Sequence, residues 1–185
     1  MNLSNKLTLS RIAMTFVMMA FLFGSGVSSK AAALLIFLLA CLTDFLDGWV
    51  ARRRNEISDF GKIMDPVADK ILIIGAFLSF VELQLIPAWM VIVVIIREFL
   101  ITSLRLFAVK KGMVLAAENA GKHKTVSQMV TVFFILLFLV IRETVPKLQD
   151  GFKAGILFLM SVTVILTILS GLTYLWQNKK LIRSL

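Results

Sequence analysis

The chain has 185 residues, of which 59% are hydrophobic, and its mean hydropathy is +0.92. Ordinary soluble domains are about half apolar, so this composition argues against a soluble protein and favours the bilayer as the environment. The net charge of +9 does not indicate a nucleic-acid-binding protein, because the Lys and Arg residues are scattered beside apolar segments and form no basic face with interleaved aromatic residues.

Six apolar segments follow one another along the chain, and their length suits helices better than barrel strands. Their ranges are 12–27, 31–50, 67–86, 87–109, 126–141 and 154–176. The sequence therefore predicts an all-α, polytopic membrane protein with six transmembrane helices in a single domain, residues 1–185. The third and fourth segments are separated only at Ile86-Pro87, where proline favours a turn. Residues 1–10 are expected to form a short interfacial segment.

Positive residues in the loops predict the orientation, because cytoplasmic loops of membrane proteins carry an excess of Lys and Arg. With a cytoplasmic N-terminus, four such residues face the opposite side: Lys30, Arg142, Lys147 and Lys153. Thirteen then face the cytoplasm: Lys6, Arg11, Arg52, Arg53, Arg54, Lys62, Lys110, Lys111, Lys122, Lys124, Lys179, Lys180 and Arg183. We therefore expect a multi-pass protein of the cell (inner) membrane with both termini in the cytoplasm.

Four of the eleven acidic residues lie where the second predicted helix ends and the third begins. Asp44 and Asp47 are three residues apart, and Asp65 and Asp69 are four apart, so each pair shares one helix face. If neighbouring helices bring these faces together, four carboxylates repel one another unless cations neutralise them. Carboxylates without His or Cys favour hard ions, so the pattern predicts two divalent cations, Mg²⁺ or Mn²⁺. Asp65 also precedes Pro66, which is typical of a helix N-cap.

Further charged residues interrupt or follow the fourth apolar segment. Arg97 and Glu98 lie within it and are expected to form a structural pair or to orient their neighbours, because buried charge needs a partner or a polar cavity. Arg105 lies about two turns after Arg97, and with Lys122 and Lys124 it would form a basic pocket for a phosphate near the metals. The alternative is that these three residues are topology determinants that touch lipid headgroups.

The acidic segment resembles the signature of the CDP-alcohol phosphatidyltransferase family, which is D-x-x-D-G-x-x-A-R, eight residues, then G-x-x-x-D-x-x-x-D. Every fixed position is matched, from Asp44 to Arg52 and from Gly61 to Asp69. The resemblance implies a six-helix, homodimeric membrane enzyme that transfers the phosphatidyl group of CDP-diacylglycerol and releases CMP. The active site of such an enzyme would face the cytoplasm, where the nucleotide is soluble.

The same resemblance implies individual residue roles. Asp44, Asp47 and Asp65 would ligate the two metals, and Asp69 would complete the metal site and act as general base. The N-terminal stretch resembles the family's pattern before the first helix, with Ser4 in place of the usual proline. Contacts to the CDP part of the donor are implied for seven residues: Asn5, Thr8, Gly48, Ala51, Arg52, Ser58 and Gly61.

The charged residues after the acidic segment suggest the acceptor. Arg97-Glu98, Arg105 and the run 121–125, Gly-Lys-His-Lys-Thr, are similar to bacterial members of the family whose acceptor is glycerol 3-phosphate. This similarity implies that Arg105, Lys122 and Lys124 bind the phosphate of sn-glycerol 3-phosphate. Two alternatives stay open: another acceptor within the family, namely inositol phosphate, serine or phosphatidylglycerol, and a divalent-cation transporter that uses the same acids.

Overall fold

The structure, a computed structural model, describes the backbone of four stretches of the chain and most of their side chains. The backbone ranges are 3–54, 59–110, 119–145 and 149–179. The side-chain ranges are 8–43, 67–68, 70–108, 124–145 and 151–179. The described residues form six helices: α1 (Leu3–Phe23), α2 (Val27–Arg54), α3 (Asp59–Glu82), α4 (Ala88–Lys110), α5 (Asn119–Thr144) and α6 (Gln149–Gln177). The prediction of an all-α chain with six helices is confirmed.

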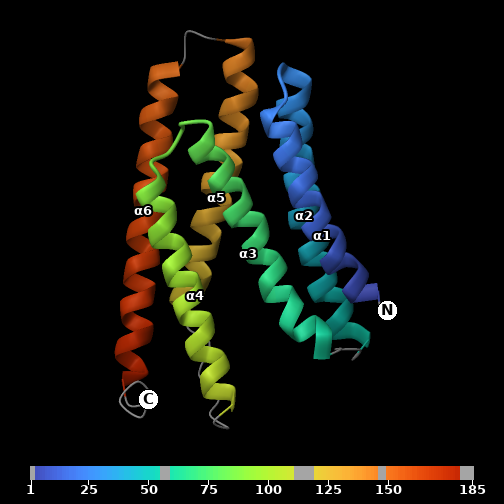
Figure 1. The fold of residues 1–185 in the computed structure, drawn as a ribbon, viewed down its shortest axis with the longest axis vertical. Coiled ribbons are helices and arrows are strands. Elements are labelled where there is room, and N and C mark those ends of the chain that lie inside the picture. The colour runs from blue at the N-terminus through green and yellow to red at the C-terminus, as the bar shows by residue number, and fades with distance from the viewer. Residues whose placement is uncertain (1–2, 55–58, 111–118, 146–148, 180–185) are drawn as a thin grey trace.

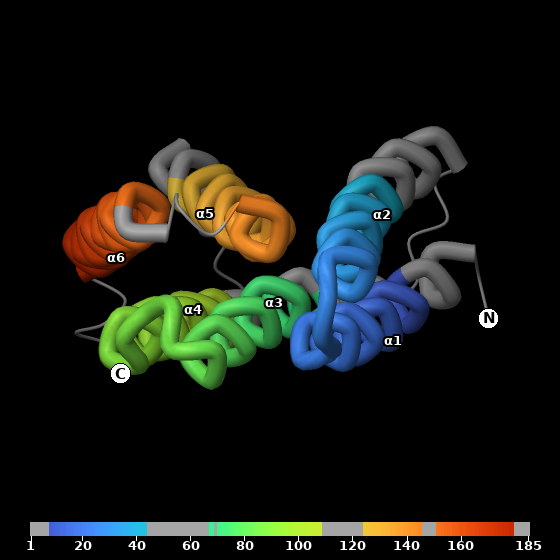
Figure 2. Tube along the Cα trace, turned by 90° about the horizontal axis from the view of Figure 1, so that it is seen from above, coloured from blue at the N-terminus to red at the C-terminus, as the bar shows by residue number. Residues whose placement is uncertain are grey.

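The helices run up and down in one elongated bundle (Figure 1). Helix α1 packs against α2 and α3, α4 packs against α3 and α6, and α5 packs against α2, α3 and α6. Seen along the bundle, α1 and α2 lie on one side and α5 and α6 on the other, with α3 and α4 along the face between them (Figure 2). Helices α2, α4 and α6 end, and α3 and α5 begin, at one end of the bundle (Figure 1). We call Asp44, Asp47, Asp65 and Asp69 the acid motif, and this end, where α2 and α3 meet, the acid-motif end.

Two helix boundaries differ from the sequence-based expectation. Helix α1 is continuous from Leu3, so residues 3–10 are its first turns and not a separate segment, and their place at the membrane interface stays a prediction. Helix α3 begins at Asp59, six residues before Asp65. The prediction that Asp65 caps this helix was therefore wrong, because the helix passes through Asp65 and Pro66, and the one donor that proline lacks does not end it.

The turns at the end opposite the acid motif are held by local hydrogen bonds. After α1, the Ser29 hydroxyl donates to the Phe21 carbonyl (2.7 Å), and the Lys30 ammonium donates to the carbonyls of Leu22 (2.5 Å) and Gly24 (2.8 Å). Because the last carbonyls of a helix lack intrahelical partners, these bonds close the C-terminus of α1. The predicted break at Ile86-Pro87 is confirmed, and Gln84 takes a left-handed conformation there (φ 56°).

Apolar side chains fill the interior and also cover much of the outside. Phe37, Phe77 and Phe138 are buried in the core, whereas Phe158 and Trp176 are 68% and 72% exposed. Two segments among the described residues are long and apolar enough to cross a membrane, 124–144 and 151–177, and 8–23 and 27–43 are shorter apolar helices. An apolar exterior of this kind is consistent with a protein of the membrane.

Candidate active site

The backbone places the two pairs of acids at the acid-motif end. Asp44 and Asp47 lie in the last three turns of α2, and Asp65 and Asp69 lie in the second and third turns of α3. Their side chains lie outside the described residues, so how closely the carboxylates approach stays a prediction. The described side chains include no group of three His, Cys, Asp or Glu residues that could hold a metal ion.

Of the seven residues predicted to contact the CDP part of the lipid donor, one has a described side chain. The side chains of six lie outside the described residues: Asn5, Gly48, Ala51, Arg52, Ser58 and Gly61. The seventh, Thr8, is fully buried on α1.

A buried polar stripe continues from Thr8 along α1. Arg11 and Thr15 are each 1% exposed, and the Thr15 hydroxyl donates to the Arg11 carbonyl (3.0 Å). The sequence analysis counted Arg11 only as a topology determinant and missed its burial. The signal was present, because Thr8, Arg11 and Thr15 recur at helical spacing where the N-terminal residues run into the first apolar segment. Their position on the helix that packs against both α2 and α3 places the stripe beside the helices of the acid motif.

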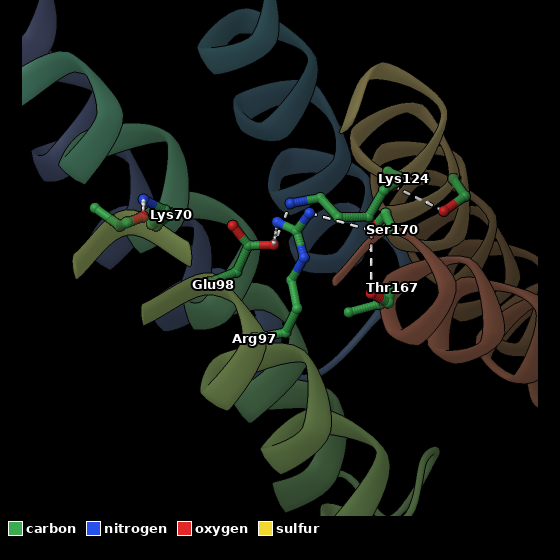
Figure 3. Close-up of polar contacts among 8 residues, drawn as sticks. Lys70, Arg97, Glu98, Lys124, Thr167 and Ser170 are labelled. Carbon is green, nitrogen blue, oxygen red and sulfur yellow. Dashed lines mark hydrogen bonds and ion pairs between the residues drawn. The ribbon is translucent and has the colours of Figure 1, made fainter. Parts of the chain in front are cut away.

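A charged cluster lies in the interior between α4, α5 and α6 (Figure 3). The Lys124 ammonium donates to the Glu98 carboxylate, and the Arg97 guanidinium lies 3.5 Å from the same oxygen, Oε1. The exposed fractions of these side chains are 6% for Lys124, 11% for Glu98 and 14% for Arg97. The expected Arg97–Glu98 pair is confirmed, and its extension to Lys124 on α5 was not foreseen.

Arg97 also links α4 to α6. Its Nη2 donates to the Ser170 hydroxyl (3.1 Å), which donates in turn to the Thr167 carbonyl (3.0 Å). Gly171 makes room for this arrangement, because a Cβ atom there would lie 3.2 Å from Arg97 Cγ. The adjacent residues Arg97 and Glu98 therefore tie α4 to both α6 and α5.

Of the three basic residues predicted to bind the acceptor's phosphate, the two with described side chains do not share one environment in the structure. Arg105 is exposed on α4, about two turns beyond Glu98 toward the acid-motif end, whereas Lys124 is buried. The Lys122 side chain lies outside the described residues. Lys70, the residue after Asp69, donates to the Thr102 hydroxyl and so connects α3 to α4 one turn from Glu98. The structure thus brings Lys124 to Glu98 and leaves Arg105 on the surface.

The bundle is apolar, carries paired acids at the junction of α2 and α3, and holds buried Arg and Lys side chains between its helices. These features fit the class of membrane enzymes that act on phosphate compounds. The chain belongs to the CDP-alcohol phosphatidyltransferase family, whose model matches residues 1–177. It is therefore an enzyme of this family.

Several named relatives are similar over nearly the whole chain. The CDP-diacylglycerol–glycerol-3-phosphate 3-phosphatidyltransferase of Bacillus subtilis is 38% identical over 96% of this chain and 95% of its own length. The enzyme of the same name from Rickettsia felis is 31% identical over 97% of this chain and 96% of its own. A probable phosphatidylglycerophosphate synthase of Mycobacterium tuberculosis is 34% identical, over 94% of this chain and 79% of its own.

Proposed function

We propose that this protein transfers the phosphatidyl group of CDP-diacylglycerol to the 1-hydroxyl of sn-glycerol 3-phosphate, forming phosphatidylglycerophosphate and CMP. The observation that carries the proposal is the full match of the family's acidic signature, placed at the junction of α2 and α3. Relatives named for this reaction are similar over nearly the whole chain, which supports glycerol 3-phosphate as the acceptor.

Two divalent cations fit the residues of the acid motif. Asp44, Asp47, Asp65 and Asp69 supply only carboxylate oxygens, the donors that Mg²⁺ and Mn²⁺ prefer. When bound, such ions offset the charge that develops on the phosphates during transfer. Both acid pairs lie at the same end of the bundle, which supports one site shared by the four carboxylates.

The chain's own residues supply the remaining functions. Asp69 takes the proton of the attacking hydroxyl as general base. Arg105, Lys122 and Lys124 hold the acceptor's phosphate, because fixed cations orient a small anion for in-line attack. The seven donor-contact residues named above, of which Thr8 is buried beside α2 and α3, bind the CDP part of the lipid.

The exposed tryptophans and the charge distribution support a proposal for the position in the membrane. Trp89 near the start of α4 and Trp176 near the end of α6 are both exposed, and they lie at opposite ends of the bundle, as expected for residues at the two interfaces. We propose that all six helices cross the membrane and that the acid-motif end faces the cytoplasm, since most Lys and Arg residues lie at that end. We further propose a homodimer, as the family resemblance implies.

Replacing the proposed base tests the reaction. The wild-type protein, purified in detergent, should release CMP from CDP-diacylglycerol when glycerol 3-phosphate and Mg²⁺ are present. Asp69→Asn should reduce the rate by about 10²-fold or more, the factor typical of a general base. Asp150→Asn, the same change near the start of α6 at the opposite end of the bundle, is the control and should retain the wild-type rate. Full activity of Asp69→Asn would refute the base assignment, and a wild type without CMP release would refute the function.

A further inference from the structure

Glu98 is the acidic residue of the buried cluster. Among the described side chains, it contacts the proposed acceptor site through Lys124. Its Oε1 accepts the hydrogen bond of the Lys124 ammonium and also lies 3.5 Å from Arg97 Nη1. In the part of the chain that the structure describes, no second acceptor bonds Lys124 Nζ. The position of the ammonium therefore depends on Glu98.

The carboxylate is itself held in place. Glu98 follows Arg97 on α4, and Arg97 is fixed against α6 by its bond to Ser170 (Figure 3). The Arg97 side chain also lies close to Gly171, where a Cβ atom would be 3.2 Å from Arg97 Cγ. A Lys side chain has a flexible four-carbon stem, so its charge occupies one place only if a partner fixes it. A buried ion pair provides this constraint, and removal of one partner leaves the other charge without compensation.

We propose that Glu98 is a positioning residue that holds the Lys124 ammonium ready for the phosphate of the acceptor. An ammonium has three donors, and within the described residues Glu98 takes one of them, so the other two can bind phosphate oxygens. Glu98 thus orders the cation before the acceptor arrives and reduces the entropy lost on binding. This inference rests on the proposed function, in which Lys124 binds that phosphate.

The test is the steady-state kinetics of Glu98→Gln with each substrate varied separately. Gln has the size of Glu but no charge, so Lys124 loses its ionic partner with little change in packing. We expect the KM for glycerol 3-phosphate to rise about tenfold, roughly the effect of one charge-assisted hydrogen bond. The KM for CDP-diacylglycerol should stay within about twofold of wild type, because Glu98 has no role at the donor site in this scheme.

Two further variants show whether Glu98 acts through Lys124. In a Lys124→Gln background, adding Glu98→Gln should change the acceptor KM no further, because coupled residues are not additive. Glu98→Asp keeps the charge on a shorter side chain and should give an acceptor KM between those of wild type and Glu98→Gln. It also carries the test if Glu98→Gln does not fold.

Glu143→Gln is the matched control. Glu143 pairs with Arg142 (3.9 Å) at the opposite end of α5, so its replacement should change neither KM. An unchanged acceptor KM in Glu98→Gln, or an equal rise for both substrates, would overturn the positioning role while the wild-type activity still supports the proposed function. A wild-type protein that does not use glycerol 3-phosphate would overturn both.

Discussion

Replacing Gly75 by Ala tests the close packing of α1 against α3. A Cβ atom at this buried position would lie 2.8 Å from Thr15 Cγ2 and 3.3 Å from Met19 Sδ. Carbon atoms in favourable contact are about 3.5–4.0 Å apart, so the helices must separate or a side chain must move. Thr15 cannot rotate easily, because its Cβ is branched and its hydroxyl donates to the Arg11 carbonyl.

The expected loss of stability is the difference of two opposing effects. Overpacking a tight interior site costs about 1–3 kcal/mol. Ala is favoured over Gly inside a helix by about 1 kcal/mol, which offsets part of that cost. The net destabilisation should be about 1 kcal/mol, which lowers the Tm of a protein of this size by about 2–4 °C.

Thermal unfolding in one detergent measures this effect, and Thr15→Ser isolates its cause. Serine keeps the hydroxyl and removes the methyl group that the new Cβ would meet, so Gly75→Ala should no longer lower the Tm in that background. Gly155→Ala is the control, because its Cβ would meet only the edge of the Phe134 ring at 3.4 Å and should not lower the Tm. If Gly75→Ala lowers the Tm equally in the wild-type and the Thr15→Ser backgrounds, contact with the Thr15 methyl group is not the cause.

Three other changes follow from the same contacts. Gly171→Val should lower the Tm by more than Gly171→Ala, because a branched side chain displaces Arg97 from α6; equal values would contradict this. Thr131→Val removes the hydroxyl that shares a 2.9 Å bond with Thr163 and donates a longer bond (3.5 Å) to the Leu159 carbonyl. The loss should be about 0.6 kcal/mol, the average for hydrogen bonds between membrane helices, because the second bond is long; a loss above about 2 kcal/mol in unfolding measurements would contradict this. Chelation with EDTA should stop CMP release and Mg²⁺ or Mn²⁺ should restore it, whereas activity that persists would refute the metal proposal.

The sequence predicted the helices better than their ends. Runs of apolar residues identified all six, and Pro87 correctly marked the turn between α3 and α4. Pro66 misled the prediction for the start of α3, because a proline near a helix start does not show how many turns precede it. Residues 1–10 were expected to form a short interfacial segment because Leu3, Leu7 and Leu9 can share a helix face, yet the same helix continues into the first apolar segment.

The sequence predicted those parts of the site whose residues lie close together along the chain. The spacing of Asp44, Asp47, Asp65 and Asp69 is visible in the sequence, and so is the adjacency of Arg97 and Glu98. The bond between Glu98 and Lys124 joins residues 26 positions apart on α4 and α5, so it depends on how the whole bundle brings these two helices within reach of each other. No local pattern contains that information.

The choice of acceptor is the central claim, and a competition assay tests it most directly. The purified protein would receive CDP-diacylglycerol, Mg²⁺ and equal amounts of glycerol 3-phosphate, serine, inositol and inositol phosphate, with CMP and the lipid products quantified together. We predict phosphatidylglycerophosphate as the dominant product, formed in equal amount to CMP. Turnover with serine, inositol or inositol phosphate and none with glycerol 3-phosphate would contradict the assignment.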